Sequence, residues 1–502
     1  MISLRLLFCA SAILLHCAHS IGATDHDRSD PAVDQSFERF VEETRLSFDV
    51  PGAVVVVVNS KGVMSIKGYG VRERGNLAPV DGDTRFQIAS MSKFLAATAV
   101  GTIVDRGIVS WDQSVREFSP ETILSIPYAT ENATLRDYFA HRTGLPAYAG
   151  DFLTGLDLTA AELVLRARHL PFDHSFRSEM AYSNYGIFLG QQAAATAAGL
   201  TPSTLLLSAI FKPLAMARSG PGRSTLFEDD NRAAGHDRDG TVMAYEDVDA
   251  FSGAGAIVST GADIARWMQM LLAQGVFDGR RVLASATVAQ IMAPSMVEGP
   301  SGPLRDKNAA AGLGCDSYHF LRYRIIEKNG ALNGVRTIVT LIPDLKVGIA
   351  VLANKQLTVF PEAVRAEFLE RQVGRSGLDL QEQIRSEQFA WNALLDIPKP
   401  PSDAAPAAHP LEAYAGTYEN AFYGPLHIRR DGNDLAITLA GKPGMLKHWS
   451  VDTFLLNFPN PDTSPGLLTF SFDTDVEHAT RIEGRSLPGA FSVNYGTFVR
   501  KP

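Results

Sequence analysis

The chain has 502 residues, of which 45% are hydrophobic and 20% are charged, as is ordinary for a globular protein. This length exceeds that of one small domain and predicts two domains, one of them large. The formal net charge of -9 argues against nucleic acid or an anionic membrane as a partner. A small molecule or a short peptide remains open as a ligand, because a local basic site can lie within an acidic protein.

Residues 1–23 predict a secretory signal peptide. Arg5 supplies the positive start, and Leu6–Leu15 is an apolar run of about ten residues that leads to small residues before a cleavage site after Ala23. The run is too short to span a bilayer comfortably, so no stable membrane insertion is expected. The alternative is a buried N-terminal helix. The sequence therefore predicts a secreted or periplasmic protein.

The first part of the mature chain predicts a helix, a hairpin and a second helix. The first helix begins at about Pro31 or Ser36 and ends at Ser47. Ala53–Val58 is short and β-branched, and turn residues separate it from Met64–Tyr69, which predicts two paired strands. The second helix starts at Ser90 and runs to about Arg106, with Gly107 as its C-terminal cap.

Strands return late in the sequence, after a middle region of helices and loops at about 110–300. The expected late elements are strands at Tyr323–Glu327, Val335–Ile342 and Val347–Ala353 and a helix at Pro361–Val373. Early and late strands can meet in one antiparallel sheet. The predicted class is therefore α+β, an antiparallel sheet flanked by helices with a mainly helical subdomain.

A proline- and alanine-rich stretch at 396–410 predicts a stiff linker. Beyond it, 411–502 predicts a small all-β domain that contains a hairpin of Leu426–Arg430 and Leu435–Leu439. The expected division is a signal at 1–23, a large domain at 24–395, the linker at 396–410 and the β domain at 411–502.

Ser90 and Lys93 form a Ser-x-x-Lys pattern at the front of the second helix. Their spacing places the hydroxyl and the amine on one helix face. A serine hydroxyl needs an adjacent base, and a lysine can serve when its surroundings lower its pKa. The alternatives are a helix-capping serine and a solvated lysine. The apolar Phe94–Ala97 that follows favours a buried helix.

Two further motifs follow in the chain, Tyr182-Ser183-Asn184 and Lys328-Asn329-Gly330. Ser-x-x-Lys, Ser-Asp-Asn and Lys-Thr-Gly are the set of penicillin-binding proteins. The order of motifs here resembles the serine β-lactamase and penicillin-recognising hydrolase superfamily, on its class C and D-alanyl-D-alanine carboxypeptidase side, which includes esterase-like members. Supporting stretches are His141–Pro146 and Gly253–Thr260 followed by Asp263. The resemblance covers about residues 36 to 372 and implies the predicted fold with an appended C-terminal β-barrel.

The resemblance implies a second proton carrier in Tyr182. Lys93 and Lys328 would lower the pKa of its phenol, which could then activate Ser90 and return the proton to the leaving group. Asn184 would orient Lys93 and the substrate amide. A core aromatic and a helix-capping asparagine are the alternatives for these two residues.

The third motif is expected to form the substrate-binding edge. Lys328 would attract a substrate carboxylate or support Tyr182, and Asn329 stands where the family usually has Thr or Ser. Gly330 lets the strand edge approach a ligand closely. By resemblance, the backbone N–H groups of Ala331 and Ser90 form the oxyanion hole.

The expected activity is that of a secreted serine hydrolase. Ser90 would attack a carbonyl carbon to form an acyl-enzyme that water resolves. The bond would be an amide or ester in a D-amino-acid peptide, a β-lactam or a simple ester, and fold alone does not select among them. The alternatives are a β-lactamase proper, a non-catalytic binder of peptidoglycan fragments and a transacylase. No metal or cofactor is expected, and His141 is assigned to loop packing rather than to a Ser-His-Asp triad.

Overall fold

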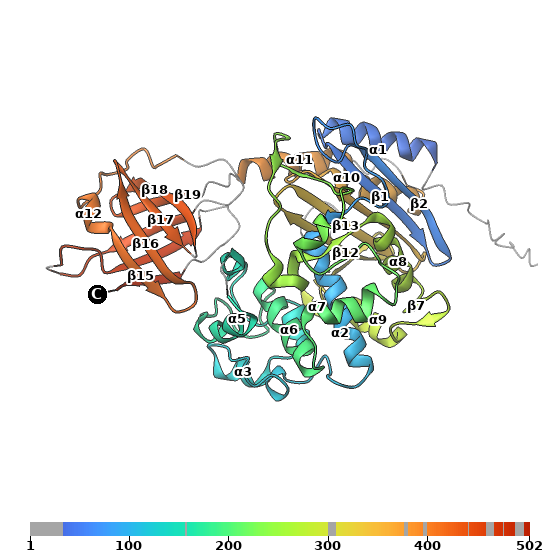
Figure 1. Ribbon diagram of the computed structural model, residues 1–502, viewed down its shortest axis with the longest axis horizontal. Helices are drawn as coiled ribbons and strands as arrows, with labels where there is room; N and C mark the ends of the chain where they lie inside the picture. The colour runs from blue at the N-terminus through green and yellow to red at the C-terminus, as the bar shows by residue number, and fades with distance from the viewer. Residues whose placement is uncertain are drawn as a thin grey trace, which may run out of the picture.

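The computed structural model describes residues 34–155, 158–299, 308–375, 380–394, 399–439, 441–457, 466–474, 476–486 and 496–501. The predicted signal at 1–23 lies outside these residues. A larger part is built on an eight-stranded sheet, and a smaller part is a closed barrel, seen on the left of Figure 1. The predicted α+β class with a C-terminal all-β barrel is confirmed.

The early and late strands meet in the large sheet, as expected. In spatial order it contains β2 (Gly62–Gly70), β1 (Gly52–Asn59), β14 (Val347–Ala353), β13 (Val335–Ile342), β12 (Tyr323–Leu332), β11 (Asp316–Phe320), β10 (Ala310–Ala311) and β9 (Met296–Val297). All its pairs are antiparallel, and Val56 of β1 lies opposite Ala350 of β14. The sequence predicted five of these eight strands and missed β9 to β11, of which two have only two residues each.

Helices cover both faces of this sheet, which explains why β1 is an unbroken apolar run. Val54 and Val56 point into one core cluster, whereas Val55 and Val57 point into another. One face carries α8 (Gly261–Leu272), with α2 (Ser92–Asp105) and α9 (Ser285–Met292) behind it; the other carries α1 (Gln35–Ser47), α10 (Phe360–Val373) and α11 (Leu380–Leu394). α11 was not predicted from the sequence.

The mainly helical subdomain lies beside α2. It contains α3 (Pro127–Asn132), α4 (Leu135–Phe139), α5 (Ala160–Arg166), α6 (Asn184–Ala197) and α7 (Pro202–Leu206). Among the described residues, no single helix is long and apolar enough to cross a membrane. The segments Asn184–Ala197 and Pro202–Phe211 reach the necessary length and apolar character only when taken together, and the chain bends sharply between them. α6 is nevertheless largely buried in the core of the larger part.

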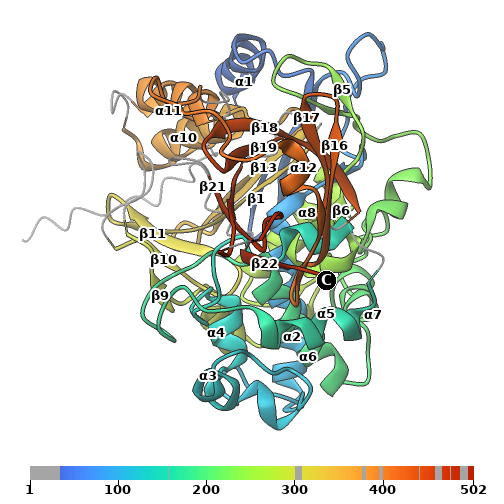
Figure 2. The ribbon, with the colours of Figure 1, turned by 90° about the vertical axis from the view of Figure 1, so that its left-hand side faces the viewer.

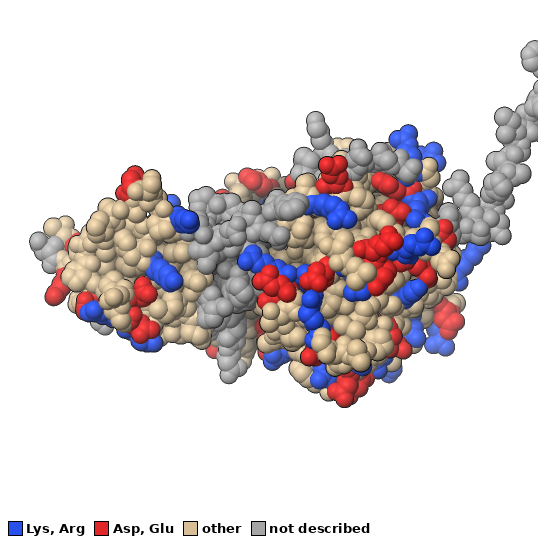
Figure 3. All heavy atoms as spheres, turned by 90° about the horizontal axis from the view of Figure 1, so that it is seen from above, with Lys and Arg blue, Asp and Glu red and all other residues tan. Residues whose placement is uncertain are grey.

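The barrel closes with eight antiparallel strands and lies in front of the larger part in Figure 2. Its strands are β15 (Gly416–Asn420), β16 (Gly424–Asp431), β17 (Asp434–Leu439), β18 (Lys442–Ser450), β19 (Thr453–Asn457), β20 (Gly466–Ser471), β21 (Arg481–Ser486) and β22 (Gly496–Arg500). The predicted hairpin forms as β16 and β17. Lys and Arg side chains alternate with Asp and Glu over the larger part on the face shown in Figure 3, in keeping with the modest net charge.

Buried charges join the sheet to α10. The guanidinium of Arg365 on α10 is ion-paired with Glu327 on β12, and both side chains are buried. Tyr318 and Thr340 each donate a hydroxyl hydrogen bond of 2.9 Å to the same carboxylate. Because the carboxylate receives several donors, its burial is compensated within the fold.

We expect Arg365→Leu to lower the free energy of unfolding by about 3–5 kcal/mol, because it leaves the Glu327 carboxylate buried without its cation. Urea unfolding of the full chain will measure the change. Lys67→Met is the matched control, since its ion pair with Glu38 is partly exposed to solvent and is expected to contribute less than about 1 kcal/mol. Equal effects of the two substitutions would contradict the prediction.

Candidate active site

Ser90 lies in a tight 3₁₀ turn, Ala89–Met91, that leads into α2. The prediction that Ser90 opens the α-helix itself was therefore wrong by two residues. Ala89 has a φ of 51°, a left-handed conformation that is uncommon for alanine and strains the backbone. The turn holds the partly exposed Ser90 beside the buried Lys93.

The amine of Lys93 is fully buried and contacts three acceptors. Its Nζ lies 3.0 Å from Ser90 Oγ, 2.6 Å from Asn184 Oδ1 and 2.6 Å from the Ala254 carbonyl oxygen. A neutral amine has two N–H donors and one lone pair, which matches two fixed acceptors and one hydroxyl proton to receive. Burial lowers the pKa of Lys93, and the nearby charge of Lys328 lowers that pKa further.

Tyr182 approaches the same hydroxyl from the other side. Its phenol donates a 2.8 Å hydrogen bond to Ser90 Oγ. The Nζ atoms of Lys93 and Lys328 lie 4.8 and 5.1 Å from the centre of its ring. Burial alone would raise the pKa of Tyr182, but the positive charges of Lys93 and Lys328 outweigh it and lower that pKa.

Asn184 is the first residue of α6, yet it does not cap that helix. Ser183 is the cap, and its Oγ accepts a 2.9 Å hydrogen bond from the backbone N–H of Gly186. The Asn184 amide is therefore available to join Lys93 to Asp151, whose Oδ2 accepts a 2.9 Å hydrogen bond from Asn184 Nδ2.

The third motif lies within β12, which ends at Leu332, five residues beyond the end that the sequence predicted at Glu327. Lys328 is buried and forms a 3.4 Å ion pair with Asp316, so it is not a solvated lysine at a strand end. The pairing of β11 with β12 stops at Asp316 and Glu327. Asn329 and Ala331 consequently lie on a segment of β12 that β11 does not cover.

Gly330 brings β12 against the turn Ala89–Met91 that carries Ser90. A Cβ atom at this position would lie 2.5 Å from the Ile88 carbonyl oxygen and 2.9 Å from the backbone nitrogen of Ser90. Only glycine permits this approach, which places the Ser90 N–H next to the strand that carries Ala331.

His141 packs against Tyr182 and does not contact Ser90 through a hydrogen bond. Its ring lies 4.7 Å from that of Tyr182, and its Nδ1 accepts a 3.1 Å hydrogen bond from the backbone N–H of Ser183. Burial and the charges of Lys328 and Lys93 hold its pKa well below the ordinary value. Within the described part of the chain, no cluster of His, Cys, Asp and Glu has the arrangement of a metal site.

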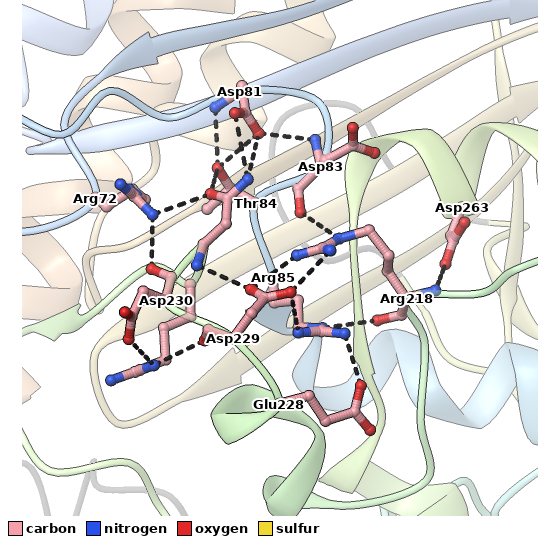
Figure 4. A network of polar contacts seen from close by, with 12 residues as sticks. Arg72, Asp81, Asp83, Thr84, Arg85, Arg218, Glu228, Asp229, Asp230 and Asp263 are labelled. Atoms are coloured by element: carbon pink, nitrogen blue, oxygen red, sulfur yellow. Dashed lines mark hydrogen bonds and ion pairs between the residues drawn. The ribbon is translucent and has the colours of Figure 1, made fainter.

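A polar network holds the strand that precedes the turn Ala89–Met91 (Figure 4). Arg85 is buried and forms ion pairs of 2.6 Å with Glu228 and 2.8 Å with Asp229. Asp229 also pairs with Arg218, whose backbone N–H donates to Asp263 at the start of α8. The network therefore ties the short strand β3 (Phe86–Gln87) to the region of α8.

Three contributors to the site were missed from the sequence, namely Asp151, Asp316 and the carbonyl of Ala254. Ala254 belongs to the stretch Gly253–Thr260 that the resemblance singled out, so its importance had a signal. No signal in the sequence pointed to Asp151 or Asp316, because neither lies in a motif.

Comparisons with known proteins find relatives of both parts of the chain. The family model described as Beta-lactamase matches residues 33–373, and a Domain of unknown function (DUF3471) matches 400–490. An unguisins hydrolase of Aspergillus campestris is 26% identical over 81% of the chain and 79% of its own length. One of Aspergillus violaceofuscus is 24% identical over 81% and 78%.

Two solved structures share the fold. The octameric penicillin-binding protein homologue from Pyrococcus abyssi has a TM-score of 0.61 at 18% identity and covers 93% of this chain and 99% of its own. A class C beta-lactamase mutant has a TM-score of 0.57 at 18% identity and covers 67% and 97%. The first similarity includes the barrel, since it extends over nearly the whole chain.

We expect an organophosphonate probe to label Ser90 at a rate that rises with pH and levels off below the ordinary pKa of lysine. The reason is that burial of Lys93 favours its neutral, proton-accepting form. Intact mass against time will give the labelling rate. Lys93→Met should slow labelling by about 10²-fold or more, and an unchanged rate would remove Lys93 from the role of base.

Proposed function

Because the chain belongs to the Beta-lactamase family, we propose that it is a serine hydrolase that cleaves an amide or ester bond in a small substrate through an acyl-enzyme on Ser90. The single observation that carries the proposal is the placement of Ser90 Oγ between Lys93 Nζ at 3.0 Å and Tyr182 Oη at 2.8 Å. Two groups with lowered pKa flank one hydroxyl, which is the arrangement that an activated nucleophile needs.

In the proposed first step, Ser90 Oγ forms a bond to the substrate carbonyl carbon while its proton passes to Lys93 or Tyr182. The C–N or C–O bond of the tetrahedral intermediate then breaks, and the leaving group takes a proton from Tyr182. Water then gives a proton to the same pair and attacks the ester carbon. The bond from that carbon to Ser90 Oγ breaks, and Oγ takes the proton back from the pair. Two groups that share a proton in this way titrate as a pair rather than singly.

We propose the backbone N–H groups of Ser90 and Ala331 as the oxyanion hole. The close approach of Gly330 to the Ser90 nitrogen supports this role, because it sets the turn Ala89–Met91 against the strand that carries Ala331. Removal of one such donor typically slows acyl transfer about 10²- to 10³-fold.

The ion pair at Lys328 bears on the substrate class. Asp316 offsets part of the positive charge of Lys328 at 3.4 Å, so a substrate carboxylate meets a weaker field there than an isolated lysine would create. Asn329 stands in the position that usually supplies a hydroxyl. We therefore favour substrates whose group near Lys328 is neutral, such as an internal amide or an ester, over those that end in a free carboxylate.

We also propose export of the protein across a membrane, with removal of 1–23. The charged start and apolar run of the N-terminus support this proposal. In the exported chain only Cys315 remains of the three cysteines, and it is buried beside Asp316.

The first experiment follows the intact mass of the mature protein mixed with a penicillin, a simple ester or a D-alanyl peptide. We expect wild-type protein to form an acyl adduct or to turn over at least one of these, and Ser90→Ala to lose at least about 10³-fold of that activity. Ser92→Ala is the matched control, because Ser92 lies only two residues further on, at the start of α2, but is buried and accepts a hydrogen bond from the Ile257 N–H.

The outcomes separate the candidate activities. A persistent penicillin adduct indicates a carboxypeptidase-like enzyme, and its quick loss with release of hydrolysed drug indicates a β-lactamase. Turnover that produces new conjugates when amines or alcohols are added indicates a transacylase. Neither adduct nor turnover with any of the three substrates would refute hydrolysis and favour a non-catalytic binder.

We further expect Asp316→Asn to raise kcat/KM for a peptide with a free C-terminal carboxylate relative to its C-terminal amide by about tenfold. The substitution keeps the shape of the side chain but restores the full charge of Lys328. Steady-state kinetics on the matched pair of peptides will measure the ratio. A ratio that does not change would show that Lys328 lies out of reach of this group.

A further inference from the structure

The barrel inserts one turn into the larger part of the molecule. This turn, Asn420–Tyr423, connects β15 to β16, and we call it the aromatic turn. The side chains of Phe422 and Tyr423 are only 1% and 2% exposed. The two aromatic side chains therefore pack against protein on all sides.

The first contact of the aromatic turn leads to Asp151. The Gly150 backbone N–H donates a 3.4 Å hydrogen bond to Tyr423 Oη, and Gly150 has a φ of 87°. A Cβ atom at Gly150 would lie 3.2 Å from the rings of both Phe422 and Tyr185, so the barrel packs closely against the loop that contains Gly150. The next residue, Asp151, accepts the hydrogen bond that fixes Asn184.

The second contact leads to the Ala254 carbonyl. The Phe422 ring meets Tyr185 edge-on at 5.3 Å, and Tyr185 lies 5.9 Å from Phe251. Phe251 directly precedes the short π-helical segment Ser252–Ala256, whose Ala254 carbonyl accepts a hydrogen bond from Lys93. Tyr185 is also the neighbour of Asn184 in the chain.

The two contacts thus converge on the two fixed acceptors of Lys93, namely Asn184 Oδ1 and the Ala254 oxygen at 2.6 Å each. The aromatic turn is itself rigid. Asn420 Oδ1 accepts 2.8 Å hydrogen bonds from the backbone N–H groups of Phe422 and Tyr423, and Asn420 Nδ2 donates to the Thr497 carbonyl in β22.

We propose that the aromatic turn of the barrel is a positioning element for Lys93, and that it acts through Asp151 and Asn184 on one side and through Tyr185 and Phe251 on the other. The inference rests on the proposed role of Lys93 as a base for Ser90. It assigns the barrel a role in the rate of the chemical step rather than in substrate binding. An amine displaced by a fraction of an ångström transfers a proton less efficiently, and such misplacement typically lowers rates by about tenfold to a hundredfold.

The test compares Phe422→Leu with Phe454→Leu in the full chain. Phe454 is 1% exposed and packs against Tyr414 and Phe470 inside the barrel, so its loss matches the size and burial of the first change away from the larger part. We expect Phe422→Leu to lower kcat at least about tenfold with KM within about twofold. Phe454→Leu should leave both near wild type while lowering thermal stability.

Asp151→Asn gives a readout that a purely structural role would not change. The charge of Asp151 raises the pKa of Lys93 against the dominant effect of burial, so its removal lowers that pKa. In the pH dependence of kcat/KM, the rise on the acid side should therefore move to lower pH. An unmoved rise, or equal kinetics in Phe422→Leu and Phe454→Leu, overturns the proposal.

Hydrogen–deuterium exchange separates this inference from the proposed function. Phe422→Leu should speed exchange in the segment 148–155, and Phe454→Leu should not, whether or not a substrate is known. Unchanged exchange overturns the positioning role by itself. If the wild-type protein turns over no substrate, the proposed function fails, whereas the exchange result still decides whether the barrel holds the loop.

Discussion

The burial of the Lys93 amine is the constraint from which the arrangement of the site follows. An amine removed from water must either lose its charge or find acceptors for its protons. Here it finds an amide oxygen of Asn184 and a carbonyl of Ala254, and each lies on a different structural unit. The third contact is Ser90 Oγ, so the hydrogen bonds that stabilise the buried lysine also direct its amine at Ser90.

Supporting layers extend outward from this centre. The network of Arg85 and Asp229 holds β3, which precedes the turn Ala89–Met91. The buried pair of Arg365 and Glu327 holds β12, which carries Lys328. Neither network contacts Ser90. Each fixes the element from which a site residue projects, which is how side chains distant in sequence acquire a common geometry.

Much of the fold was predictable because it depends on local pattern. The β-branched run of β1 and the late strands β13 and β14 follow from composition and periodicity, and three short motifs located Ser90, Lys93, Tyr182 and Lys328. Short edge strands such as β9 carry too few residues to show any period. Asp151 and Asp316 act through tertiary contacts with groups far along the chain, at Asn184 and Lys328, and a local pattern cannot reveal such contacts.

The backbone of Ala89 has a consequence for how this protein can be altered. A left-handed conformation costs an L-amino acid about 1–2 kcal/mol relative to glycine, and the φ of 51° places Ala89 there. Glycine would relieve that strain and stabilise the folded state, yet it would also give the turn that bears Ser90 more conformations to visit. A change of Ala89 to glycine for heat resistance would therefore raise stability at the cost of rigidity at Ser90. A larger β-branched residue at this position would lower both stability and rigidity.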